Sequence, residues 1–283
     1  MKYANKCNQT DFYFKRHCIL ANFMEDNSKT IEYVLYIDAD MAVINPCHRI
    51  QDYIDDDPEI DMIFYERYFN HEFAAGSFII RNTNYSISIL RYWSEYSFRV
   101  PKSFHGTDNG AIHQVFMDLS FNETSKQKQC YDLWEISENY EDLFTFQACT
   151  KDALSKISPF IINNKIKIIP KMSPGWVRDG WLTNTLWSSE DFMLHGFKEA
   201  EISIGKWAFP FLDKFNMSKC HYGDASFPNF KYVKDYVATE ERVRNLLGLE
   251  TMKVHTNYVN FLRKIQLIRF VQSKDKNKVN PFL

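Results

Sequence analysis

The chain has 283 residues, of which 45% are hydrophobic and 25% charged, which suits a globular protein of one large domain or two small ones. The formal net charge of -2 excludes a general basic field for nucleic acid, and no run of about 18 apolar residues predicts a membrane span. The first residues show no apolar stretch of the signal-peptide kind. Glycine is scarce, with 9 residues and no G-x-G, so a nucleotide site here would not be a glycine-rich cradle.

The first part of the chain predicts a helix followed by a buried strand. Apolar residues at helical spacing predict a helix over residues 12–24. Residues 33–37 are all apolar or aromatic, which favours a strand covered on both faces in a parallel sheet. Pro46 suits the start of a short helix that reaches residue 53.

The remaining elements continue this alternation of strands and helices. Further strands are predicted at residues 61–65, 77–81 and 166–169, and further helices at residues 84–98, 110–117, 239–247 and 258–271. The alternation predicts an α/β fold with a mostly parallel sheet flanked by helices. We expect residues 1–200 to form this domain, and residues 201–283 to form an aromatic and helical C-terminal extension packed on it.

An acidic pair, Asp38 and Asp40, stands where the apolar strand runs out. Ligands of open α/β sheets bind at the carboxyl ends of strands, and residues two apart on extended backbone point to the same side. Two carboxylates there can share a hard divalent cation such as Mn²⁺ or Mg²⁺, which can neutralise a diphosphate. The alternative is a structural cap. Asp55 and Asp57 have the same spacing but lie in a polar turn, where solvated carboxylates are expected.

The segment YVLYIDADMAVINP, at residues 33–46, resembles the metal-binding signature of GT-A-fold glycosyltransferases that use nucleotide sugars. Among these enzymes it is most similar to the retaining galactosyl-, mannosyl- and xylosyltransferase group. A related animal family that is functionally uncharacterised resembles it more closely still. Residues 75–82, 107–112 and 194–198 resemble, in order, the sugar-site strand, the segment beside the reacting carbon, and the late His–Lys segment of that group. The resemblance spans about residues 12–200.

The resemblance implies a GT-A-like fold and transfer of a sugar from a nucleotide-diphosphate donor, UDP- or GDP-linked, to a glycan or glycoprotein hydroxyl, with retention of configuration. The implied site residues are Asp38, Asp40 and His195 on Mn²⁺ or Mg²⁺, Ala75, Gly76, Ser77 and Lys198 on the donor, and Asp108 and Asn109 at the sugar or acceptor. It also implies the lumen of the Golgi or endoplasmic reticulum. A membrane anchor is expected for full-length members of the group, and this sequence encodes none.

The chain departs from the group at several positions. Ala74 and Asn109 replace an asparagine and a glutamine, and the spacing from His195 to Lys198 is shorter than usual. Only about 30 residues precede the strand at residues 33–37, so the strand that holds the nucleobase in GT-A domains is expected to be missing. We therefore expect a chain truncated at its N-terminal end or a degenerate homologue.

Rival interpretations remain open from the residues alone. Asp108 also suits a helix cap, His195 a core position and Lys198 the surface, while the tryptophans of residues 176–187 suit either the core or a sugar-stacking surface. An inactive lumenal binding protein on a decayed transferase fold is the main rival. A haloacid-dehalogenase-type phosphatase with Asp38 as nucleophile is less favoured, because Ala42 stands where threonine or valine is usual.

The cysteines and glycosylation sequons bear on the compartment. Six widely spaced cysteines without C-x-x-C argue against a zinc ribbon or a thioredoxin-type motif, and they fit disulfides or buried thiols equally well. Sequons at Asn8, Asn84, Asn122 and Asn216 lean toward a secreted or lumenal protein.

Overall fold

The structure is a computed structural model that describes residues 2–122, 124–198, 200–201, 210–213, 216, 218 and 230–278. Within them the helices are α1 (Phe12–Asp26), α2 (Asn84–Glu95), α3 (Thr107–Ser120), α4 (Thr124–Glu135), α5 (Tyr140–Ser155) and α7 (Glu240–Lys278). The strands are β1 (Tyr33–Ile37), β2 (Met41–Val43), β3 (Met62–Tyr65), β4 (Ser77–Arg81), β5 (Ile161–Ile162), β6 (Ile166–Ile169), β7 (Val177–Asp179) and β8 (Met193–His195). Short 3-10 turns lie between them, at Ala4–Lys6, Ile50–Tyr53, Tyr96–Phe98, Gly180–Thr183 and Lys234–Tyr236.

The strands form two mixed sheets, so the prediction of a mostly parallel sheet is wrong. The larger sheet has the order β1-β4-β3-β6-β5, and only its β3–β6 pair is parallel. The smaller sheet has the order β2-β8-β7, with β2–β8 antiparallel and β7–β8 parallel. The reason is local: β3 connects to β4 without a helix, and a connection of that kind favours antiparallel pairing.

β1 lies at the edge of the larger sheet, where its one strand partner is β4. The expected parallel neighbour is therefore wrong, but both faces of β1 are in contact with apolar layers: Val34 and Tyr36 pack against one core cluster, and Tyr33 and Leu35 against another. Residues 33–36 are only partly buried, and Ile37 is 42% exposed. The apolar run correctly predicted a strand, but edge and interior strands can carry the same residues.

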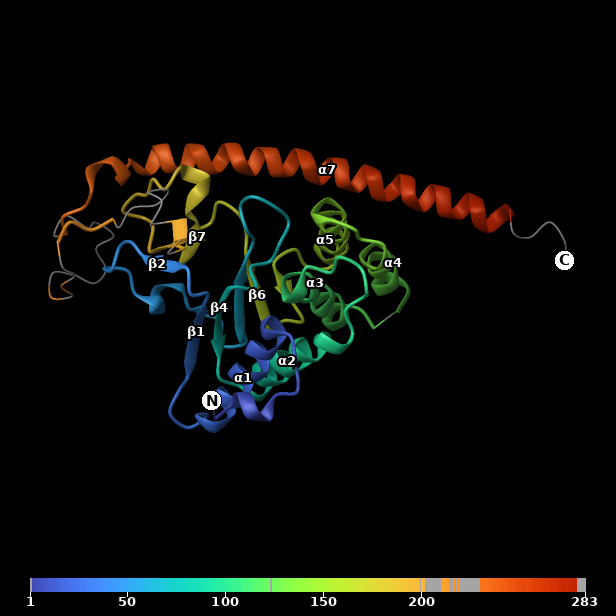
Figure 1. The fold of residues 1–283 in the computed structure, drawn as a ribbon, viewed down its shortest axis with the longest axis horizontal. Coiled ribbons are helices and arrows are strands. Elements are labelled where there is room, and N and C mark those ends of the chain that lie inside the picture. Colours follow the sequence, from blue (N-terminus) through green and yellow to red (C-terminus); the bar gives the residue numbers. More distant parts are fainter. Residues whose placement is uncertain are drawn as a thin grey trace.

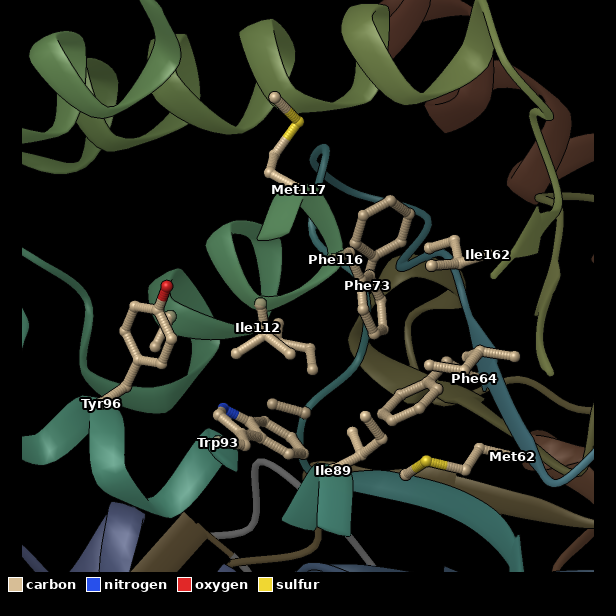
Figure 2. Packing of buried hydrophobic residues seen from close by; sticks show 14 of the residues in the cluster. Met62, Phe64, Phe73, Ile89, Trp93, Tyr96, Ile112, Phe116, Met117 and Ile162 are labelled. Atoms are coloured by element: carbon tan, nitrogen blue, oxygen red, sulfur yellow. The ribbon is translucent and has the colours of Figure 1, made fainter. Parts of the chain in front are cut away.

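The five-stranded sheet separates two apolar layers, because successive residues of a strand point to opposite faces. Met62 and Phe64 of β3 face the main core, which the helices α1–α5 and Ile265 of α7 complete. Figure 2 shows Phe64 in this core beside Trp93 and Phe116, with ring centroids 6.1 and 5.3 Å away. Ile63 and Tyr65 of the same strand face a second cluster with β7 and β8.

The C-terminal extension is dominated by one helix. α7 is continuous from Glu240 to Lys278, so the prediction of two separate helices there is wrong. In Figure 1 it lies across the whole domain, from the end that carries β2 and β7 to beyond α4 and α5. Its buried residues, which attach it to the body of the protein, are Val243, Leu247, Val254 and Ile265.

Several local predictions also need correction. α4 and α5 were not predicted, and Pro46 is followed by a 3-10 turn at Ile50–Tyr53 rather than an α-helix. The predicted helices at residues 12–24, 84–98 and 110–117 are present, with boundaries shifted by a few residues or a 3-10 end.

The cysteines form two disulfides within the described residues. Cys7–Cys18 ties the N-terminal turn to α1, and Cys130–Cys149 joins α4 to α5. Cys47 is a buried free thiol, and Cys220 lies outside the described residues. All four sequon asparagines are exposed. Among the described helices, none combines the length and the apolar character that crossing a bilayer requires.

Candidate functional site

The acidic pair lies in the turn between β1 and β2 rather than on extended backbone, which corrects the predicted local geometry. The turn is held against the end of β8 by its backbone. The Asp40 carbonyl accepts hydrogen bonds from the amides of Gly196 (3.0 Å) and Phe197 (2.9 Å). Antiparallel pairing of β2 with β8 sets Met41 opposite His195. The late histidine therefore lies beside the acidic pair although the two are far apart in the sequence.

Asp38, Asp40 and His195 form a constellation that fits a divalent cation. One ligand atom from each residue lies within 4.8 Å of the other two. The side chains are partly accessible, at 30%, 21% and 16% exposure. Two carboxylates and an imidazole form a donor set that suits Mn²⁺ among the first-row metals. The three residues expected to act together are thus brought together, and the bound ion itself stays a prediction.

A third carboxylate orients the histidine. His195 Nδ1 lies 2.8 Å from Asp179 Oδ1, and His195 Nε2 lies 3.2 Å from Asp40 Oδ1. Asp179 is 4% exposed; although burial would raise its pKa, Arg67 at 2.8 Å and His195 hold that pKa below its ordinary value. Asp179 is placed to accept a hydrogen bond from Nδ1, and in that tautomer the Nε2 lone pair would be available to a cation at the acidic pair. Carboxylates hold metal-ligating histidines in this way.

Arg16 of α1 bridges two carboxylates at the other side of the site. Its NH1 donates to Asp38 Oδ1 at 2.7 Å, while Nε and NH2 donate to Asp108 Oδ2 at 3.0 and 2.6 Å. Burial raises the pKa of Asp38 above its ordinary value, and the Arg16 charge opposes that rise. In the absence of a cation, Arg16 therefore supplies part of the positive charge that the acidic pair requires.

Asp108 has a buried position. It is the second residue of α3 and is 0% exposed, while Gly106 occupies the cap, so the N-cap alternative is not what the structure shows. His17 Nε2 donates to Asp108 Oδ2 at 2.8 Å, and the His17 ring is stacked on Trp93 at 3.5 Å. Burial lowers the pKa of His17, which fits a neutral ring. In this conformation the Asp108 carboxylate is fully buried and is paired with Arg16 and His17.

The segment Ala75–Gly76–Ser77 packs directly behind the acidic pair. A β-carbon at Gly76 would lie 2.2 Å from Asp38 Oδ2, so glycine is required for the carboxylate to occupy its place. Ala75 is fully buried. The Ser77 hydroxyl is also buried; it donates to the Tyr36 carbonyl at 2.9 Å and accepts from Trp176 Nε1 at 2.8 Å. These side chains support the site from within.

The other predicted residues lie at its periphery. Asn109 is partly buried beside Asp108, and Lys198 is exposed after the end of β8. Trp176 and Trp187 are core residues, whereas Trp181 is 38% exposed and its ring centroid is 5.4 Å from that of His195. Trp181 therefore offers an aromatic face next to the acidic pair.

Sequence reasoning missed four charged or polar residues of this network, namely Arg16, His17, Arg67 and Asp179. A lone charged residue in a helix or an aromatic run predicts a solvated side chain, and nothing local distinguishes these. The sequence carries one weak signal for Asp179. This residue stands at the end of a short strand-like segment, just as Asp38 follows the end of β1.

The fold and this acidic–histidine centre define the molecule as an α/β protein with a candidate divalent-cation site. The chain belongs to the family described as "Protein of unknown function, DUF273", whose profile matches residues 1–206 and so includes every residue of the centre. No curated protein matches the chain.

One solved structure is similar at a low level. It is described as the "crystal structure of a glycosyltransferase involved in the glycosylation of the major capsid of PBCV-1". The TM-score is 0.36 at 13% identity, over 70% of this chain and 78% of that one. A TM-score this low does not establish a shared fold.

Proposed function

We propose that this protein is a metal-dependent glycosyltransferase. It would move a sugar from a UDP- or GDP-linked donor to a hydroxyl of a glycan or glycoprotein, with retention of configuration. The observation that supports the proposal most is the cluster of Asp38, Asp40 and His195, completed by Asp179 behind the imidazole. The sequence resemblance of these residues to nucleotide-sugar transferases adds to it.

The position of each site residue suggests its role in the proposed reaction. Asp38, Asp40 and His195 Nε2 would hold Mn²⁺ or Mg²⁺ at the mouth of the turn between β1 and β2. When bound, the cation supplies electrostatic stabilisation to the diphosphate as it leaves. Lys198, three positions beyond His195 and exposed, can add a second positive charge there. Trp181 offers a stacking face for the sugar or base, and Asn109 an amide for a sugar hydroxyl.

We also assign Arg16 a role in the proposed reaction. It lies 2.7 Å from Asp38, so a bound cation would share that carboxylate with the guanidinium. Asp108 fixes the other edge of the guanidinium and keeps Arg16 at the site. A positive group held there also favours the negatively charged leaving nucleotide. The role that we assign to Asp108 is therefore positioning, through Arg16.

The two disulfides and the four exposed sequon asparagines favour an oxidising compartment. The proposed location is accordingly the lumen of the Golgi or endoplasmic reticulum, or the outside of the cell.

The experiment compares the wild type with Asp40→Asn. We expect wild-type protein to bind Mn²⁺ and to hydrolyse or transfer from a nucleotide sugar only when Mn²⁺ or Mg²⁺ is present. Asp40→Asn should lose both properties and keep its melting temperature within a few degrees, because Asp40 is partly exposed. Isothermal titration with MnCl₂ and a coupled assay for released nucleotide measure the two.

Asp57→Asn is the matched control. Asp57 is exposed, and its Oδ1 accepts from the Glu59 amide, which an asparagine oxygen can also do. It should retain Mn²⁺ binding. If wild-type protein with intact secondary structure binds neither Mn²⁺ nor nucleotide diphosphates, the catalytic proposal fails. The Arg16–Asp38 ion pair would then have a structural role, as in the inactive binding protein considered above.

A further inference from the structure

A cavity of about 540 Å³ lies on the same side of the small sheet as the acidic centre. Val177 and Met193 line it, and each is two positions before a residue of the centre, Asp179 and His195, on the same strand. Two residues of strand span about 7 Å, and residues two apart face the same way. The cavity and the cation site are therefore neighbours along one face, between the small sheet and the larger one.

The walls of the cavity combine aromatic rings with polar groups. Tyr53, Tyr65, Tyr68 and Phe192 line it, and the rings of Tyr53 and Phe192 are parallel to within 6°. The hydroxyl of Tyr53 lies 2.9 Å from His48 Nδ1, at the same wall. Pockets for small molecules have roughly 300–1,000 Å³ and are mainly apolar with a few placed polar groups. This cavity has both properties.

The charged side chains that line the cavity already have ion-pair partners, either at the cavity or outside it, as Asp52 has in Arg49. Arg178 holds Asp191 through two hydrogen bonds, of 2.6 and 2.8 Å. Glu190 pairs with Arg244 of α7, and Glu66 with Lys151. A charged ligand would have to compete with these pairs, whereas a neutral ligand with hydroxyl groups can hydrogen-bond to them. A sugar ring meets both demands, since its faces carry C–H bonds and its edges carry hydroxyls.

From these observations we infer that this cavity binds a neutral saccharide. In combination with the proposed function, on which this second step rests, the saccharide is the acceptor glycan, whose hydroxyl would approach the donor from the Val177–Met193 wall. The first turns of α7 close the cavity through Val243, Arg244 and Leu247. The C-terminal helix α7 would therefore contribute to the acceptor site.

Gly175 gives a direct way to test the inference. It lines the cavity, and a β-carbon placed on it meets no atom within 4 Å. Gly175→Phe should therefore narrow the cavity from this wall without a clash at the β-carbon. Gly248 on α7 is the matched control, because its β-carbon also points into open space and it does not line the cavity.

Binding is measured without metal or nucleotide. The probes are the methyl glycosides of glucose, galactose, mannose and xylose, together with lactose and cellobiose, at up to about 10 mM, observed by saturation-transfer NMR and titration calorimetry. We expect at least one probe to bind saturably, to lose tenfold or more in affinity in Gly175→Phe and in Tyr53→Ser, and to bind normally in Gly248→Phe.

The outcomes separate the two proposals. Asp40→Asn should bind the saccharide normally and lose Mn²⁺, whereas Gly175→Phe should keep Mn²⁺ and lose the saccharide. The inference is overturned if no probe binds folded wild-type protein, or if bound probes are unaffected in both Gly175→Phe and Tyr53→Ser. Binding of 1-octanol in place of every saccharide, with the same dependence on Gly175, would likewise overturn it and indicate an apolar ligand.

Discussion

Gly76 and Asp38 are in such close contact that a single added methyl group would occupy the space of the carboxylate. The ideal β-carbon position at Gly76 is 2.2 Å from Asp38 Oδ2 and 2.9 Å from its Cγ. The backbone immediately before β4 thus sets the position of the first acidic residue, which approaches it from the end of β1. The contact makes a conformational test of the cation site possible without removing any charge.

Gly76→Ala should weaken Mn²⁺ binding by about tenfold or more, because the Asp38 side chain must rotate away from Asp40 and His195. The fold should survive, since the atoms that move are the end of a flexible side chain. Gly175→Ala is the matched glycine-to-alanine control and should bind as the wild type does. Titration calorimetry with MnCl₂ gives the affinities; equal affinity in both variants would remove Asp38 from the ligand set.

Asp179→Asn tests the orientation of His195. The asparagine oxygen can still accept the Nδ1 proton, but the loss of the carboxylate charge lowers the basicity of Nε2. Loss of such a partner typically costs about 10–100-fold in metal affinity, and we expect a decrease of that size for Mn²⁺. Electron paramagnetic resonance of free Mn²⁺ measures it. Retention of wild-type affinity in a folded variant would contradict the role assigned to Asp179.

Arg16→Met should affect stability and cation binding in opposite directions. Removal of one partner leaves the buried Asp108 charge poorly compensated, which costs about 3–5 kcal/mol in the free energy of unfolding. The same change frees Asp38 from its guanidinium and should tighten Mn²⁺ binding. Urea unfolding and Mn²⁺ titration report the two effects. The double variant with Asp108→Asn should regain part of the stability. If it does not, the uncompensated Asp108 charge is not the cause of the destabilisation.

Lys171 should make stability depend on pH above neutrality. Burial lowers the pKa of its ammonium from 10.5 to about 7 in the folded protein. Between these values the unfolded chain binds more protons than the folded one, so the free energy of unfolding rises with pH. The slope is up to about 1.4 kcal/mol per pH unit from this group. In Lys171→Met, urea unfolding at pH 7, 8 and 9 should show a flatter dependence; an unchanged slope would contradict the shift.

The sequence indicated the three clustered residues of the candidate cation site, but not the residues around them. Asp38, Asp40 and His195 could be found because each stands in a recognisable run, at the end of an apolar strand or in a late His–Gly segment. Arg16 and Asp179 could not, since their contacts with the site depend on how α1 and β7 are placed. Such placements are decided by packing between segments remote in the sequence.

The sequence predicts most of the strands and several of the helices, but not how the strands pair with one another. An apolar run predicts a strand, but it does not say whether the neighbour is parallel, and β1 proved to be an antiparallel edge strand. The start of α5 carries a recognisable capping signal. Asn139 accepts hydrogen bonds from the amides of Glu141 and Asp142, a capping residue followed by two acidic residues.

The join between the turn after β1 and the end of β8 has a consequence for the connectivity of the whole domain. Asp40 lies in the turn between β1 and β2, and His195 ends β8, the neighbour of β2 in the small sheet. The chain between them contains the other four strands of the larger sheet and the helices α2–α5. A cation held by both residues would act as a removable cross-link that closes a very long loop, and such a closure takes most of its effect from the entropy of the unfolded chain. Chelation would then increase cleavage by a protease as well as reduce activity, because the pairing of β2 with β8 would lose this additional restraint while the disulfides of the helical layer stayed in place.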